Sequence, residues 1–162
     1  MRSGFLGVAC ACAIVACTDD IGLPMGTADL AFEGAGSATV AWAIAHGAPS
    51  GYAGWSVFFG ATGSAETSCN DGSAGFVAQV DLWIDGSSSD APSPLPAGEY
   101  IGCGSGARCA AMNVTGDTVE FGEVELLESD ASHLTGSLEG SATTGSGASI
   151  AFYGSFDAQI CD

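Results

Sequence analysis

Positive charge is almost absent from this sequence. It contains no lysine and two arginines, Arg2 and Arg108, against nineteen Asp and Glu residues, which gives a formal net charge of −17. Nucleic-acid binding depends on Lys and Arg side chains that neutralise phosphates, and attraction to an anionic membrane surface depends on the same basic residues. The composition therefore excludes nucleic acid as a partner. We expect the acidic side chains to keep an exported protein soluble.

Motifs that indicate catalysis or metal binding are also missing. No G-x-S-x-G nucleophile elbow, phosphate-binding Walker loop, HExxH zinc motif or EF-hand loop occurs. A C-x2-C pair is absent as well, and the two histidines, His46 and His133, stand in unrelated segments, so no zinc site is expected. We interpret both histidines as solvated side chains. The sequence therefore predicts no catalytic residue and no metal ligand.

Calcium is the one cofactor for which donor-rich loops exist. Asn70-Asp71 and the segment from Asp85 to Asp90 place oxygen donors in flexible loops, and Ca2+ takes six to eight oxygen ligands. Neither loop has a recognised ligand spacing, and Asx residues are the ordinary formers of turns. We therefore interpret both segments as turns, with calcium as the alternative, and expect no cofactor.

The first 16 residues have the layout of a secretory signal. One positive charge at Arg2 is followed by an uncharged apolar stretch and then by small residues. This stretch is too short for a membrane-spanning helix, which needs about 20 apolar residues. Directly after it, Ile14-Val15-Ala16-Cys17 resembles the lipobox of bacterial lipoproteins, a resemblance that covers these few residues alone.

The lipobox resemblance implies a cellular location for the protein. It implies cleavage before Cys17 and acylation of that thiol. The residues that follow predict a tether over 17–27 and a folded domain over 28–162. Cys10 and Cys12 are poorer anchors because neither has a branched aliphatic residue three positions before it. We expect an exported protein held by its N-terminal lipid on a bacterial membrane, at the outer membrane or cell surface. A secreted, unlipidated protein is the alternative.

The remaining cysteines indicate disulfides. Cys69, Cys103, Cys109 and Cys161 are an even number in an exported chain, which reads as two disulfides with three possible connectivities. Cys103 and Cys109 flank a turn of small residues, so we favour a bond between them. That choice leaves Cys69 to pair with Cys161.

Hydrophobic alternation with a period of two predicts strands almost throughout the domain. It runs clearly through 40–44, 55–59, 76–84 and 150–158, and turns rich in Gly and Ser separate these segments. No stretch after the tether has a convincing helical period. A change of phase at Gly122 suggests a β-bulge there. About eight or nine short strands predict an all-β fold, an antiparallel β-sandwich first and a small β-barrel second.

Trp83 is the most informative single residue for binding. Its parity places it with Asp81 and Asp85, away from the apolar positions of the same strand. An aromatic side chain among carboxylates on an outer sheet face is suited to a sugar or a protein partner, although a loop or a second sheet could cover it. Glu120, Glu123 and Glu125 are interpreted as a solvated face.

Three functions remain open from the sequence. The first is a lipid-anchored binding or structural module of the cell envelope with a protein or glycan partner. The second is a surface hydrolase that acts on glycans, which would need two convergent carboxylates in a cleft. The third is a small secreted interaction or inhibitor protein that presents the loop from Gly104 to Arg108.

Overall fold

A computed structural model describes nine segments of the chain, and these segments contain ten strands and one helix. The described residues are 23–34, 38–47, 54–71, 76–85, 94–102, 108–114, 117–119, 123–143 and 147–161. The predicted signal, Cys17 and most of the tether lie outside them. The elements are β1 (Thr27–Gly34), β2 (Ala38–Gly47), β3 (Gly54–Gly60), α1 (Ala65–Asp71), β4 (Phe76–Ile84), β5 (Gly98–Gly102), β6 (Arg108–Val114), β7 (Asp117–Val119), β8 (Glu123–Ser129), β9 (His133–Thr143) and β10 (Ser149–Ile160). None of the described helical residues forms a helix with the length and apolarity needed to cross a membrane.

Nine of the strands close into a mixed β-barrel. They follow the order β4-β3-β2-β1-β10-β9-β8-β5-β6, and β6 pairs back onto β4, while β7 extends from β6. Most pairs are antiparallel, but β5 pairs with β6 and β2 pairs with β10 in parallel. The all-β prediction is confirmed, and of the two expected arrangements the structure adopts the barrel.

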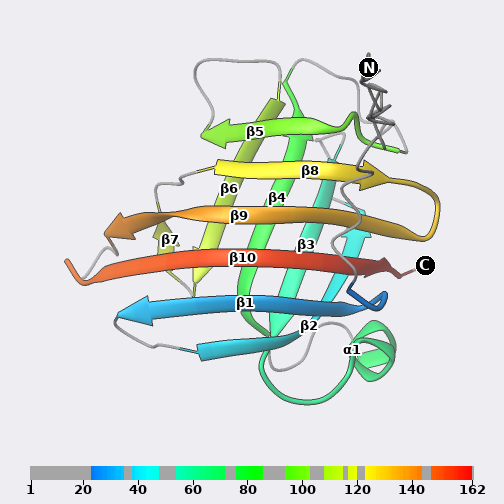
Figure 1. The fold of residues 1–162 in the computed structure, drawn as a ribbon, viewed down its shortest axis with the longest axis horizontal. Helices are drawn as coiled ribbons and strands as arrows, with labels where there is room; N and C mark the ends of the chain where they lie inside the picture. The colour runs from blue at the N-terminus through cyan, green and yellow to red at the C-terminus, as the bar shows by residue number, and fades with distance from the viewer. Residues whose placement is uncertain are drawn as a thin grey trace, which may run out of the picture.

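The barrel is flattened into two layers that cross. Figure 1 shows β5, β8, β9, β10 and β1 side by side in front, with β3, β4 and β6 crossing behind them. β2 links the layers because it pairs with β1 and β3 and, at its end, with β10. The register between β1 and β2 shifts between Thr27 and Leu30, and such a bulge bends a strand and increases its twist. Bent corner strands of this kind join crossed sheet layers.

Apolar side chains fill the interior of the barrel. Phe59 and Phe156 meet edge to face with ring centroids 5.5 Å apart, and Phe32 lies 6.4 Å from Phe152. Tyr100 is fully buried among them. One contiguous cluster of buried residues from all the barrel strands surrounds these rings, as expected for a barrel of this size. Groups that could recognise a partner therefore lie on the outside.

A second, smaller cluster lies outside the barrel under α1. β2 turns Ala43 and Ala45 toward the interior, whereas Trp42 and Ile44 are buried on the opposite side. The indole Nε1 of Trp42 donates to the carbonyl of Thr62 at 2.6 Å. Because α1 covers the outer side of β2 at Trp42 and Ile44, the middle of this strand is buried on both faces.

Helix α1 was not predicted from the sequence. It has only seven residues, too few to show a helical hydrophobic period. Ser64 accepts the amide of Thr67 at 3.3 Å, as an N-cap residue does. Cys69 within the helix forms a disulfide with Cys161, 92 residues away, which is the predicted pairing. The cap and this covalent link hold a helix that is too short to be stable alone.

A bulge in β8 determines which residues face outward at the end of that strand. The predicted bulge at Gly122 lies outside the described residues. The register of β8 against β9 shifts between Leu126 and Glu128, so that Leu126 pairs with Gly136 and Glu128 pairs with Thr135. The extra residue keeps Glu128 on the outer face, whereas a regular strand would turn it toward the interior.

Candidate functional site

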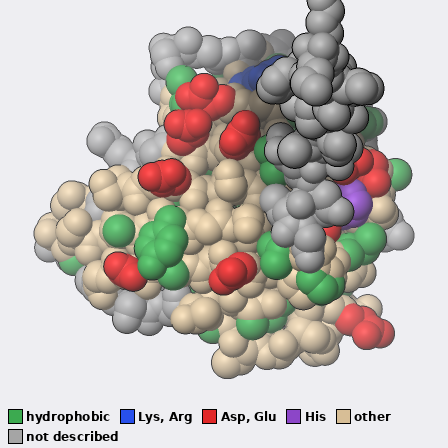
Figure 2. All heavy atoms as spheres, viewed as in Figure 1, with side chains coloured by type: hydrophobic (Ala, Val, Ile, Leu, Met, Phe, Trp, Pro, Cys, Tyr) green, Lys and Arg blue, Asp and Glu red, His purple; other side chains and the backbone are tan. Residues whose placement is uncertain are grey.

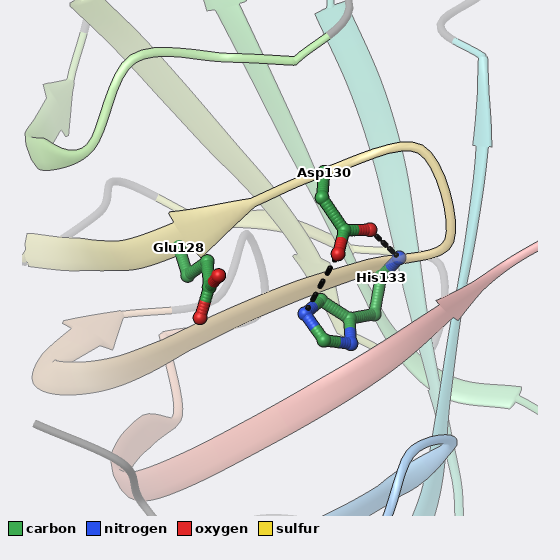
Figure 3. Close-up of side chains that lie close together, drawn as sticks. All are labelled: Glu128, Asp130 and His133. Carbon is green, nitrogen blue, oxygen red and sulfur yellow. Dashed lines mark hydrogen bonds and ion pairs between the residues drawn. The ribbon is translucent and has the colours of Figure 1, made fainter.

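Glu128, Asp130 and His133 form a cluster at the hairpin that joins β8 to β9, here called the histidine cluster. Glu128 stands near the end of β8, Asp130 in the turn and His133 at the start of β9 (Figure 3). One donor atom from each residue lies within 4.8 Å of the other two. An imidazole and two carboxylates therefore converge on one point of the outer surface.

Asp130 is held in place by the turn that it builds. Its Oδ1 accepts the amide of Ser132 at 2.6 Å, the amide of His133 at 2.9 Å and the hydroxyl of Ser132 at 2.9 Å. The two amide hydrogen bonds, first that of Ser132 and then that of His133, lower the pKa of Asp130 from 3.8 to about 2. Asp130 is therefore a carboxylate at neutral pH, with Oδ2 directed at the ring of His133 (Figure 3).

His133 is largely buried between two carboxylates, so its interpretation as a solvated side chain is wrong. Its side chain is 21% exposed, with Nε2 3.4 Å from Oδ2 of Asp130 and Nδ1 3.8 Å from Oδ1 of Asp157. Both ring nitrogens are shielded from solvent, and neither makes a hydrogen bond. Asp157 comes from the neighbouring strand β10. In the β9–β10 register Gln159 pairs with His133 and Asp157 pairs with Thr135, so Asp157 lies on the same face as His133.

A separate group of glutamates occupies the outer face of β5, β8 and β9. Glu99 stands directly opposite Glu125, and Glu123 stands directly opposite Glu139. All four side chains are exposed, and acidic side chains gather on this part of the surface (Figure 2). We call these four residues the acidic face. Like charges placed directly opposite in a sheet repel each other, so this arrangement costs stability.

A shallow depression lies within the acidic face. It has a volume of about 390 Å³ and is lined by Ile101, Glu123, Glu125, Ser137 and Glu139. Its carboxylates can attract a cationic group. A glycosidase acid, in contrast, is kept protonated by an apolar surrounding, which exposed side chains lack.

Two of the three residues predicted as a binding patch share the outer face of β4. Asp81 and Trp83 point to this side, and Asp85 follows the end of the strand. Oδ1 of Asp81 accepts hydrogen bonds from Ser56 at 2.6 Å and from Gln79 at 2.8 Å. Trp83 is half-buried. The patch stays a prediction, with Asp81 already engaged by its neighbours.

The structure describes only some of the remaining predicted positions. Cys109 is disulfide-bonded, but Cys103 lies outside the described residues, so the pairing of these two stays a prediction. Asn70 and Asp71 are the last two residues of α1, so their interpretation as a turn is wrong, and the side-chain amide of Asn70 donates to the carbonyl of Glu66. Most of the second loop considered for calcium, and Glu120, lie outside the described residues.

Sequence reasoning missed the histidine cluster because its members looked ordinary one by one. A local signal existed: Asp130 begins a short turn, Asp130-Ala131-Ser132, that a hairpin would place between Glu128 and His133. The fourth residue, Asp157, comes from a strand whose position follows only from the β9–β10 register. Comparison of the chain with models of protein families, with curated proteins and with solved structures finds no match.

Proposed function

We propose that this chain is an exported, lipid-anchored binding module of the bacterial cell envelope, attached through Cys17. The observation that carries the proposal is the filled barrel, in which one apolar cluster occupies the interior. A barrel of this kind has its recognition groups on the outside. The disulfide between Cys69 and Cys161 suits an oxidising compartment, in agreement with export.

The acidic face is the surface that we propose for binding, and its partner is a cationic protein surface. Glu123 and Glu139 repel each other across two strands, so a cationic partner would relieve that repulsion when it binds. The chain itself has no lysine that could relieve this repulsion. Surface complementarity of this kind also raises the rate of association.

Removal of charge from the acidic face tests this proposal. In the double variant Glu123→Gln/Glu139→Gln, we expect affinity for a short lysine-rich peptide, measured by fluorescence anisotropy, to weaken by roughly fivefold or more. The matched control is Asp29→Asn/Glu66→Gln, which removes the same charge from two exposed residues elsewhere. An equal loss in the control would show that net charge, and not this face, attracts the peptide.

A surface hydrolase that acts on glycans is the second candidate. It is favoured by the opposition of Glu123 and Glu139, because the hydrolysis of glycosides uses two carboxyl groups that face each other across the bond to be cleaved. The exposure of both side chains favours binding instead. The third candidate, a secreted interaction or inhibitor protein, depends on the loop before Arg108, which lies outside the described residues.

A further inference from the structure

We propose that the histidine cluster is a binding site for a divalent transition-metal ion of the Zn2+ class. The ligands are Nε2 of His133, Oδ2 of Asp130 and the carboxylate of Glu128, and Asp157 orients the imidazole from behind. The site is independent of the proposed contact through the acidic face, since the two groups share no residue.

The spacing of the donor atoms carries the proposal. Nε2 of His133 and Oδ2 of Asp130 are 3.4 Å apart without a hydrogen bond between them. Zn2+ binds nitrogen and oxygen at about 2.0–2.2 Å, so two ligand atoms at a tetrahedral angle around it stand about 3.3–3.6 Å apart. The pair already has the separation that a shared ion requires. Glu128 is exposed at a strand end and within 4.8 Å, so a small rotation of its side chain completes three ligands.

The surroundings of His133 point to the same kind of ligand. A neutral imidazole has one N–H donor and one nitrogen acceptor, and an acceptor nitrogen that faces a carboxylate oxygen is repelled. A cation between Nε2 and Asp130 turns that repulsion into attraction. Nδ1 then carries the proton and faces Oδ1 of Asp157 at 3.8 Å, so the ring must move closer to this carboxylate to form the carboxylate–histidine–metal arrangement found behind many metal ligands.

The fold holds the donors before any ion binds. Three hydrogen bonds fix Oδ1 of Asp130 and leave Oδ2 available, and the bulge in β8 keeps Glu128 on the same face. Asp157 is buried in β10 with its side chain only 10% exposed. One nitrogen and two oxygen donors favour Zn2+, Mn2+, Co2+ or Ni2+ over Ca2+, which prefers oxygen ligands throughout.

Calorimetric titration of the tag-free chain with Zn2+ tests the site. We expect one ion per chain in the unchanged protein and no saturable binding in His133→Ala. Asp157→Asn should weaken binding by about 10- to 100-fold, the usual effect of losing a supporting carboxylate, and Glu128→Gln by at least roughly tenfold. The matched control is Glu139→Gln, which removes one carboxylate from the neighbouring acidic face and should leave the affinity unchanged.

Two results would overturn the proposal. One is the absence of saturable Zn2+ binding by the unchanged chain, and the other is an affinity that falls as much in Glu139→Gln as in Glu128→Gln. Nuclear magnetic resonance of the unchanged protein keeps the test valid if a variant fails to fold. Zn2+ should shift the Nε2 resonance of His133 and leave His46 unmoved. Equal shifts in both rings, or none, would count against the site.

Discussion

At the scale of single residues, environment decides what a side chain can do, and His133 and Tyr100 illustrate this. The alternation of β9 assigns His133 to the outer face correctly but does not reveal the two carboxylates that lie beside its ring nitrogens. Tyr100 lies in the interior, and its hydroxyl donates to the carbonyl of Pro96 at 2.8 Å. Burial raises the pKa of Tyr100 above its usual 10.0, and the nearby Arg108 opposes that rise in part. Each residue has one partner within four residues in sequence, but its burial depends on strands that are distant in sequence.

The raised pKa of Tyr100 predicts a loss of stability in alkali. The unfolded chain loses the phenolic proton near pH 10 while the folded chain retains it, so this contribution is complete below pH 10 and disappears as the pH rises through the folded pKa. In Tyr100→Phe, loss of the hydrogen bond to Pro96 should cost about 1 kcal/mol at neutral pH. Urea unfolding should show that this deficit shrinks above pH 10. A deficit that stays constant with pH would contradict the assignment.

At the scale of elements, the strands are largely predictable and the helix is not. The alternation along 76–84 correctly places Ala78, Val80 and Leu82 inside, although Phe76 at the strand end is 41% exposed. Strand periodicity is a local pattern, and it is the same in every sheet that has one buried face. α1 depends on contacts with distant residues, namely Cys161 and the Trp42 side chain beneath it. No local sequence pattern therefore predicts this helix.

The packing of α1 onto β2 predicts a specific sensitivity at Gly60. A Cβ atom there would lie 1.9 Å from Cζ2 of Trp42, so any side chain must displace the indole. We expect Gly60→Ala to lower the free energy of unfolding by about 1–3 kcal/mol, the usual cost of overpacking. Denaturant unfolding with the disulfide intact measures this. Gly47→Ala at the end of β2, where an added Cβ meets nothing within 4 Å, should be close to neutral. Equal effects would refute the packing argument.

At the scale of the whole molecule, the local patterns of the sequence do not reveal that the sheet closes into a barrel. A sandwich and a barrel share the same alternation, and they differ only in pairings between distant strands, such as β4 with β6 and β2 with β10. Asp157 reaches His133 through the same kind of distant register. The three proposed ligands of the candidate metal site are therefore local to one hairpin, and only the supporting Asp157 depends on the topology.

The membrane location that we propose for the whole molecule requires a means of attachment. A chain with a net charge of −17 is repelled by an anionic bilayer, so we expect the lipid predicted on Cys17 to provide the attachment. A single acyl chain binds reversibly, whereas two or more hold a protein stably. Cys17→Ser should therefore move the protein from the membrane fraction to the soluble fraction and abolish its labelling with radioactive palmitate. Cys12→Ser, which removes a cysteine of the expected signal, should change neither. Unchanged membrane association of Cys17→Ser would show that some other part of the chain holds it there, and the lipid anchor would have to be abandoned.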